Sequence, residues 1–245
     1  MKRIIDVFFS FMGLLLISPI LILFMLLVWF QDFNSPFYFA PRMLGRGKKF
    51  KMVKLRSMVV HADKLGGTST AGSDDRITWV GHIIRKFKLD ELTQLWNVLK
   101  GEMSLVGPRP QAEYDANLYS EEEMRLLDIK PGITDFSSIV FADEGDILSN
   151  SIDPDLKYNQ VIRPWKSRLG LVYVDKNSIS LDFKLILLTI ISIFSRKKAL
   201  YGVNVLLGNI NACGNLRKIS LREDELIEYP PPGFDQIVKS LPRNK

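Results

Sequence analysis

The sequence predicts an α+β fold that is mostly helical, with a kinked N-terminal re-entrant membrane helix, interfacial amphipathic helices and a small β element. Three stretches lead to this prediction. Residues 7–30 are uncharged and apolar, residues 88–100 carry apolar side chains at steps of three and four, and residues 50–58 mix Phe, Val and Met with basic residues. The first pattern is typical of a membrane helix, the second of an amphipathic helix and the third of a strand.

The apolar run at residues 7–30 is long enough to cross a bilayer. It is too long for the apolar part of a signal peptide and has no small-residue cleavage motif, so we expect a retained anchor. Pro19 in its middle cannot donate a hydrogen bond to the carbonyl of Leu15 and its ring crowds the preceding turn. The Ser18 hydroxyl can satisfy a carbonyl freed in this way. Ser18 and Pro19 therefore predict a kink.

Basic residues flank the apolar run on both sides. Lys2 and Arg3 precede it, and seven Lys or Arg follow it between Arg42 and Arg56. Because basic flanks prefer the cytoplasm, a hairpin that enters and leaves the same leaflet suits them better than a straight transmembrane helix, which is the alternative. Residues 1–60 carry nine basic and two acidic side chains, a net charge of +7. This charge next to an apolar run indicates an anionic lipid surface as partner rather than nucleic acid.

The remaining chain predicts short elements joined by turns. Residues 31–47 are interpreted as a turn-rich link, residues 50–58 as a strand followed by a helix to residue 64, and residues 66–73 as a loop. Further helices are expected at residues 77–87, 113–127 and 221–228, a turn at 130–134, and a core or interfacial helix at 181–194.

Cysteine and histidine are scarce. One cysteine, Cys213, excludes an intramolecular disulfide and a Cys-rich zinc site. The two histidines, His61 and His82, are expected to be structural.

Asp90 and Glu91 form an acidic pair at the start of the helix predicted over residues 88–100. Unpaired N–H groups and the positive end of the helix dipole favour an ionised carboxylate there, and can also hold a phosphate. The alternative is that Asp90 only caps the helix. Two arginines lie nearby in sequence: Arg85, and Arg109 between Pro108 and Pro110, where fixed backbone angles hold a guanidinium in place for a phosphate.

Several motifs together resemble the bacterial sugar transferases, the monotopic phosphoglycosyl transferases. The resemblance covers residues 1–195 and includes the Ser-Pro break in the first helix. The motifs are KLRSM at residues 54–58, DRIT at 75–78 with Gly81 and Arg85, LDEL at 89–92, QLWNVLKG at 94–101, MSLVGPRP at 103–110 and KPGIT at 130–134.

The resemblance implies an enzyme on the cytoplasmic face of the bacterial inner membrane. Such enzymes move a sugar 1-phosphate from a UDP-sugar to polyprenyl (undecaprenyl) phosphate at the first membrane step of surface glycan or glycoconjugate assembly. Asp90 would be the nucleophile that expels UMP and carries a covalent phosphosugar, which implies ping-pong kinetics. A magnesium ion is also implied, with Asp90 and Glu91 as candidate ligands. The basic groups expected to bind the diphosphate are Arg85, Arg109, Lys54 and Arg56.

The implied organisation is a re-entrant anchor at residues 1–35, a catalytic domain at 36–198 and a C-terminal extension of unknown role at 199–245. Thr93 replaces a proline usual in the family, and Asp135, Phe136, Ser137 and Ser138 depart from the family pattern near a segment expected to face the sugar. The sugar therefore stays open, as does the oligomeric state, a homodimer being one alternative. Rival functions are a membrane phosphatase or pyrophosphatase, which would transfer to water, and a catalytically silent membrane scaffold.

Overall fold

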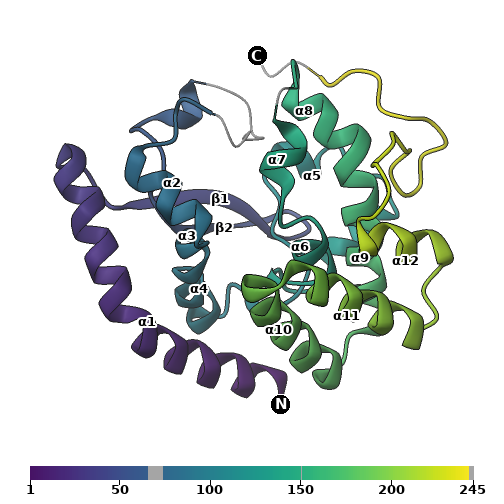
Figure 1. Cartoon of the computed structure of the whole chain (residues 1–245), viewed down its shortest axis with the longest axis horizontal. Helices are drawn as coiled ribbons and strands as arrows, with labels where there is room; N and C mark the ends of the chain where they lie inside the picture. Colours follow the sequence, from purple (N-terminus) through teal and green to yellow (C-terminus); the bar gives the residue numbers. More distant parts are fainter. Residues whose placement is uncertain (66–73, 150, 243–245) are drawn as a thin grey trace.

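The computed structural model describes residues 1–65, 74–149 and 151–242. The expected loop at residues 66–73 lies outside the described residues. Helices dominate, and two separate two-stranded sheets complete the fold (Figure 1). The mostly helical prediction with a small β component is therefore confirmed.

Helix α1 (Lys2–Asp32) is, in the described part of the chain, the one helix long and apolar enough to cross a membrane. It changes direction midway and runs along one side of the molecule (Figure 1). The Ser18 hydroxyl donates a 2.8 Å hydrogen bond to the carbonyl of Leu15, the group that Pro19 leaves without its usual partner. Few side chains of α1 are buried in the protein, namely Asp6, Ser10, Leu21 and Val28.

Both ends of α1 are bound to the body of the protein. Near its start, Arg3 donates to the carbonyls of Val98 and Leu99, and Asp6 accepts hydrogen bonds from Ser104. At the other end, Asp32 pairs with the buried side chain of Arg56. The two ends of the apolar helix are therefore fixed to one folded unit.

Strands β1 (Phe37–Gly45) and β2 (Lys48–Leu55) form an antiparallel hairpin, with a register shift near Met43. The interpretation of residues 31–47 as a link was wrong. Pro41 is tolerated within β1 because a two-stranded sheet consists of edge strands. The strand expected at residues 50–58 begins and ends earlier. The helix expected to follow it is only the short 3-10 turn η1 (Ala62–Lys64), because His61 adopts a left-handed conformation with φ of 61°.

The predicted helix over residues 88–100 is broken in two. Helix α2 (Trp79–Lys86) is followed by α3 (Leu89–Leu92) and α4 (Leu95–Lys100). The expected apolar stripe is only partly buried: Leu89 is buried, whereas Trp96 is 53% exposed. The polar residues Thr93 and Asn97 are buried and bound to β2. Leu95 instead faces α1, where a side chain at Gly13 would meet it.

A second, parallel pair of strands was not predicted. Strand β3 (Ser104–Val106) pairs with β4 (Gly132–Thr134), where a turn was expected. Just beyond β3, Gly107 and Gly132 touch through their backbones, since a Cβ on Gly132 would lie 2.0 Å from the Gly107 nitrogen. Only glycine fits such an approach. The polar helix expected at residues 113–127 is likewise two short pieces, α5 (Glu113–Ala116) and η2 (Glu123–Leu127).

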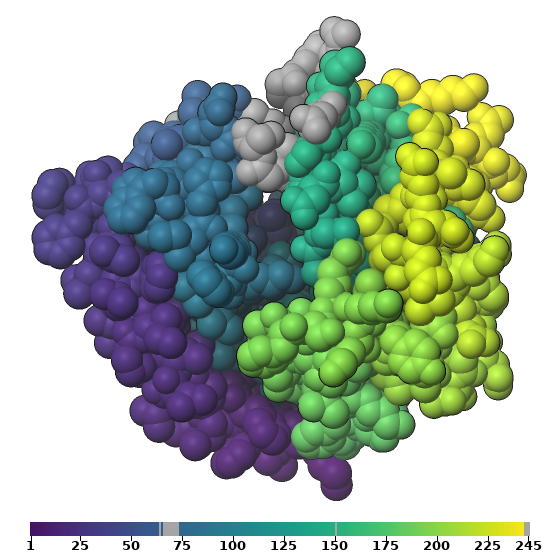
Figure 2. Space-filling model, in the orientation of Figure 1, coloured from purple at the N-terminus to yellow at the C-terminus, as the bar shows by residue number. Residues whose placement is uncertain are grey.

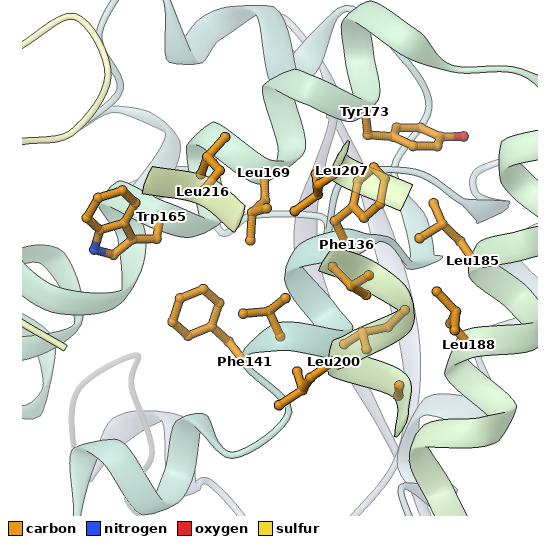
Figure 3. Packing of buried hydrophobic residues seen from close by; sticks show 14 of the residues in the cluster. Phe136, Phe141, Trp165, Leu169, Tyr173, Leu185, Leu188, Leu200, Leu207 and Leu216 are labelled. Carbon is orange, nitrogen blue, oxygen red and sulfur yellow. The ribbon is translucent and has the colours of Figure 1, made fainter. Parts of the chain in front are cut away.

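The second half of the chain contains the main core. Its elements are α6 (Phe136–Val140), α7 (Glu144–Leu148), α8 (Pro154–Lys157), the π-helical turn η3 (Tyr158–Ile162), α9 (Arg163–Lys176), α10 (Ile179–Phe194), α11 (Arg196–Asn209) and α12 (Gly214–Leu221). Side chains of α6, α9, α10, α11 and α12 pack together in this core (Figure 3). Helix α10 confirms the helix expected at 181–194.

The C-terminal region contributes to this core. Ala199, Val203 and Leu207 of α11 and Leu216 of α12 are buried within it. The boundary expected between residues 198 and 199 thus falls inside α11. The helix expected at residues 221–228 was wrong in position, because α12 ends at Leu221 and the following residues form an extended tail.

Candidate active site

A cleft of about 700 Å³ separates the hairpin and α2–α3 from α6–α9. Figure 2 shows it as a hollow at the centre of this face, between the blue surface of α2 and α3 and the teal surface of α7. Charged side chains of both signs line it. The charged lining residues are Arg42, Lys54, Arg85, Lys86, Lys88, Asp90, Glu91, Arg109, Asp115, Asp143, Glu144, Asp146 and Lys166.

Asp90 lies in the first turn of α3 with its side chain only 15% exposed. Its nearest charged partner in the described residues is Lys54, whose Nζ lies 3.8 Å from Oδ2 of Asp90. Burial raises the pKa of the Asp90 carboxyl, and the charge of Lys54 opposes that rise. Since α3 has four residues rather than the thirteen expected, its dipole contributes less than predicted. The charges of Lys54, Arg109 and Arg85 favour the ionised form of the Asp90 carboxyl.

Lys54 is held close to Asp90 by the fold. It is near the end of β2, and the Thr93 hydroxyl links that strand to α3 through bonds of 3.0 Å to the Val53 carbonyl and 2.9 Å to the Asp90 carbonyl. Burial lowers the pKa of Lys54, and the charge of Asp90 counters this effect. The hydrogen bonds of Thr93 thus hold α3 against β2, whereas a proline at this position would restrict the backbone directly.

Glu91 has a different partner from Asp90. Arg109 Nη2 donates a 2.9 Å hydrogen bond to Glu91 Oε1. Burial raises the pKa of Glu91, but the charges of Arg109, Lys88 and Lys54 and this hydrogen bond outweigh it and lower the pKa to about 2. The charge of Glu91 is also the main reason that the pKa of Arg109 is raised. The adjacent carboxylates are therefore distinct, because Glu91 is closely paired and Asp90 is not.

The position of Arg109 follows from the glycine contact beside it. Gly107 donates to the Thr134 carbonyl at 3.0 Å, and Gly132 donates to the Pro108 carbonyl at 2.9 Å. These bonds hold the turn against β4 while the flanking prolines restrict its backbone. The guanidinium is thereby presented to the cleft.

Arg85 also reaches the cleft, as predicted. It lies in the last turn of α2, and its Nε donates to the Ser57 hydroxyl at 3.1 Å. Burial lowers its pKa, while the charge of Asp90 works in the opposite direction. Arg85, Lys54 and Arg109 therefore come together near Asp90.

Arg56 is not brought to this cleft. Its guanidinium binds Asp32 at the end of α1, with 2.5 Å from Nη1 to Oδ2 and 2.6 Å from Nη2 to Oδ1, and also donates to the Ser35 carbonyl. In a continuous strand, residues two positions apart, such as Lys54 and Arg56, lie on the same face. Strand β2 ends at Leu55, and Arg56 turns toward α1.

The opposite wall of the cleft contains residues that were not singled out. Asp115 from α5 faces Arg42, and burial raises the pKa of Asp115 to about 6. Glu144 from α7 is paired with Lys166 from α9. His82, expected to be structural, is exposed and lines the cleft as well. No short motif connects these segments, and only the packing of α5, α7 and α9 brings them to one wall.

The donor set for a metal ion is limited. Over residues 1–65, 74–149 and 151–242, no group of three or more His, Cys, Asp or Glu side chains is arranged to hold one. Mg²⁺ in phosphate-transfer sites is usually bound by one or two carboxylates, waters and substrate phosphates. Asp90 and Glu91 are two adjacent carboxylates that line the cleft, which matches the protein share of such a donor set.

The fold and cleft together define a mostly helical protein with one membrane-length helix, in which a weakly paired carboxylate faces several cations, an arrangement suited to chemistry at phosphorus. A family model for bacterial sugar transferases matches residues 1–196. The chain belongs to the bacterial sugar transferase family.

Relatives agree with this assignment. ExoY, an exopolysaccharide production protein of Rhizobium meliloti (strain 1021), is 38% identical over 148 residues, covering 54% of this chain and 66% of that protein. The uncharacterized sugar transferase EpsL of Bacillus subtilis (strain 168) is 36% identical over 191 residues, covering 78% of this chain and 85% of EpsL.

A third relative has a more specific name. The UDP-N-acetylgalactosamine-undecaprenyl-phosphate N-acetylgalactosaminephosphotransferase of Aeromonas hydrophila is 31% identical over 170 residues, covering 67% of this chain and 40% of that protein. The chain thus spans just under two thirds of the length of ExoY and less than half of the Aeromonas protein.

Proposed function

We propose that this protein transfers a sugar 1-phosphate from a UDP-sugar to polyprenyl phosphate, with Asp90 as the nucleophile and UMP as the leaving group. The observation that carries the proposal is the unequal pairing of the two carboxylates in a cation-rich cleft. Glu91 is bound to Arg109 at 2.9 Å, whereas the nearest cation to Asp90 is 3.8 Å away. A nucleophile needs this combination of stabilised charge and available lone pairs.

The reaction proceeds in two displacements at one phosphorus. An oxygen of Asp90 attacks the phosphorus that bears the sugar, a P–O bond to aspartate forms, and the P–O bond to UMP breaks so that UMP leaves with the bridging oxygen. An oxygen of the polyprenyl phosphate then attacks the same phosphorus. The aspartyl P–O bond breaks, the sugar diphosphate remains on the lipid, and Asp90 is regenerated as a carboxylate.

The side chains around Asp90 have separable roles. Lys54, Arg85 and Arg109 offset the negative charge of the diphosphate, which would otherwise repel the attacking carboxylate. Glu91 orients Arg109 through their hydrogen bond. A Mg²⁺ ion bound by Asp90 and Glu91 together with the diphosphate would supply further positive charge to the phosphate oxygens.

The contacts of α1 support a re-entrant anchor. A helix that crossed the membrane would have its ends on opposite sides, yet Arg3 and Asp6 at one end and Asp32 at the other all bind the same folded unit. A helix that enters and leaves one leaflet satisfies both sets of contacts. The basic flanks then favour the cytoplasmic face of the bacterial inner membrane.

Helix α10 supports an interfacial position for the catalytic part. Phe183, Leu187, Ile190 and Phe194 recur on one exposed stripe, and the Phe183 ring lies 6.1 Å from that of Phe9 in α1. The stripe therefore continues the apolar surface of the anchor. This arrangement suits a substrate whose phosphate lies at the interface while its hydrocarbon chain stays in lipid.

The chemical step can be tested with a UDP-sugar labelled in the phosphate that bears the sugar. Without acceptor, the wild-type protein should release UMP and retain label on Asp90, detected by mass spectrometry, and Asp90→Asn should show neither. Addition of polyprenyl phosphate should move the label to lipid. Absence of label from the wild type would contradict the covalent step, and release of inorganic phosphate from the lipid would indicate a phosphatase.

The topology can be tested with cysteines at residue 1 and after residue 33. Both should react with a membrane-impermeant reagent only when the cytoplasmic face is open. Opposite accessibility of the two positions would show that α1 crosses the bilayer.

A further inference from the structure

The chain beyond residue 196, outside the region matched by the family model, lies against the cleft wall opposite Asp90. That wall is built from very short helices. Of the helices that line it, α5 has four residues, and α6 and α7 have five each. Helices of this length are not stable alone, so contacts with other segments decide their positions.

Arg222, the residue that follows α12, contacts the two residues Phe141 and Asp143 in the turn that leads into α7. Its Nη2 lies 3.1 Å from Oδ2 of Asp143, and its guanidinium is 5.3 Å from the centre of the Phe141 ring. The side chain of Arg222 is only 11% exposed. Arg196, at the start of α11, binds the other oxygen of Asp143 at 2.8 Å. Phe141, Asp143 and Glu144 all line the cleft, whereas Arg196 and Arg222 do not. Both arginines therefore bind a residue of the wall without lining the cleft themselves.

The extended tail after α12 contacts the same wall at a second place. Tyr229 packs on Trp165 with ring centres 4.6 Å apart, and Arg168 lies 4.8 Å from the Tyr229 ring. The backbone of the tail binds η3 through Gln160, which accepts from Tyr229 N at 3.0 Å and donates to the Val238 carbonyl at 2.8 Å.

Two further bonds complete this attachment. The Ser120 hydroxyl donates to the Pro232 carbonyl at 2.6 Å, and the Tyr114 hydroxyl donates to the Pro242 carbonyl at 2.7 Å. Tyr114 is next to Asp115, and Gln160 is close in sequence to Tyr158; Asp115 and Tyr158 both line the cleft. The tail thus binds elements that carry cleft-lining residues, such as α5 and η3, while none of its own described residues lines the cleft.

We propose that the C-terminal segment positions the wall opposite Asp90, with Arg222 as its main positioning residue, and so sets the affinity for the nucleotide-sugar donor. The proposal rests on the function proposed above for the identity of that donor. Arg222 touches neither Asp90 nor the cations around it, so it acts through α7. Loss of its contact should loosen donor binding while the displacement at Asp90 continues at saturation.

The test compares Arg222→Gln with Lys218→Gln in the full-length protein. Lys218 is an exposed lysine of the same helix, so both variants lose one positive charge. Arg222→Gln should raise the KM for the donor about five-fold, with little change in kcat, whereas Lys218→Gln should match the wild type. Tyr229→Leu removes the aromatic contact of the tail without changing charge and should also raise KM.

Hydrogen exchange separates this proposal from the proposed function. Amides of residues 141–148 should exchange faster in Arg222→Gln than in Lys218→Gln, and this readout requires no substrate. Unchanged exchange together with unchanged KM in Arg222→Gln and Tyr229→Leu would overturn the positioning role. A wild-type protein that releases no UMP from any UDP-sugar, but shows the faster exchange in Arg222→Gln, would instead overturn the proposed donor.

Discussion

The Nζ of Lys54 lies 3.8 Å from Oδ2 of Asp90, and this pair joins the end of β2 to the first turn of α3. The charge of Lys54 opposes the effect of burial on the Asp90 pKa more strongly than that of Arg109 or Arg85. The pair therefore controls at what pH the proposed nucleophile is ionised.

Replacing Lys54 by methionine should move the acid limb of the activity profile to higher pH. Burial already raises the pKa of Asp90, and loss of the neighbouring positive charge raises it further, so a smaller fraction is ionised at any acidic pH. The measurement is kcat/KM for UMP release as a function of pH. Lys51→Met, at an exposed lysine of the same strand, is the control and should keep the wild-type limb. An acid limb at the wild-type pH in Lys54→Met would show that Lys54 does not influence the ionisation of Asp90.

Replacing Glu91 by glutamine should destabilise the protein in a pH-dependent way. The folded-state pKa of Glu91 is about 2, below the ordinary value of 4.5, so its ion pair stabilises the fold fully above about pH 4.5. That stabilisation is lost as the pH falls toward 2. We expect Glu91→Gln to lose about 2 kcal/mol at pH 7 and progressively less below pH 4.5, measured by thermal unfolding in micelles.

Glu113→Gln serves as the control for this experiment. Glu113 pairs with Lys49 on the surface, and both side chains are more than half exposed. Exposed ion pairs contribute little, so the unfolding temperature should barely change. An equal loss of stability in Glu91→Gln and Glu113→Gln would mean that the Glu91–Arg109 pair contributes no more than an exposed ion pair.

Thr93→Val should impair the protein more than Thr93→Ser. Valine keeps the shape but removes the hydroxyl that donates to the Val53 and Asp90 carbonyls, whereas serine keeps it. We expect a loss of stability of about 1–3 kcal/mol and a lower kcat for the valine variant. If the two variants behave alike, the methyl group rather than the hydroxyl holds α3 to β2.

Arg56→Gln should lower stability without weakening donor binding. Its guanidinium is buried and bound to Asp32 at the end of α1, away from the cleft. Breaking this pair should cost about 2 kcal/mol, and Asp32→Asn should cost a similar amount. The double variant should lose less than the sum of the single losses, because both remove the same interaction. A raised KM for the donor with an unchanged unfolding temperature would instead indicate that Arg56 binds the diphosphate, as the sequence predicted.

Much of the local structure could be predicted because its causes are local. Pro19 has no N–H wherever the chain folds, and the Ser18 hydroxyl compensates within one helical turn. The helices at residues 77–87 and 181–194 have amphipathic patterns of sufficient length, and both are present as α2 and α10. Arg85, Lys54 and Arg109 reach the cleft with Asp90 as expected.

The sequence predictions were wrong where contacts with segments distant in the chain determine the local structure. The apolar stripe of residues 88–100 indicated one helix, but Thr93 binds the Val53 carbonyl and the polar residues Gln94 and Asn97 are fully buried. Strand β4 looked like a turn because its partner β3 is 28 residues earlier. Residues of α5, α7 and η3 gave no site motif, since each carries only one or two of the side chains that line the far wall.

The sequence by itself indicated a protein of the bacterial sugar transferase family with an apolar segment of membrane length, and it predicted that Asp90, Glu91 and Arg109 lie together, as they do in one cleft. The resemblance of the ordered motifs to the family and the apolar run at residues 7–30 carry that information. The tertiary structure alone decided which carboxylate is paired with Arg109, that Arg56 binds the end of α1, and that the C-terminal region contacts elements that line the cleft. These assignments depend on distances between side chains far apart in the chain, and packing determines those distances.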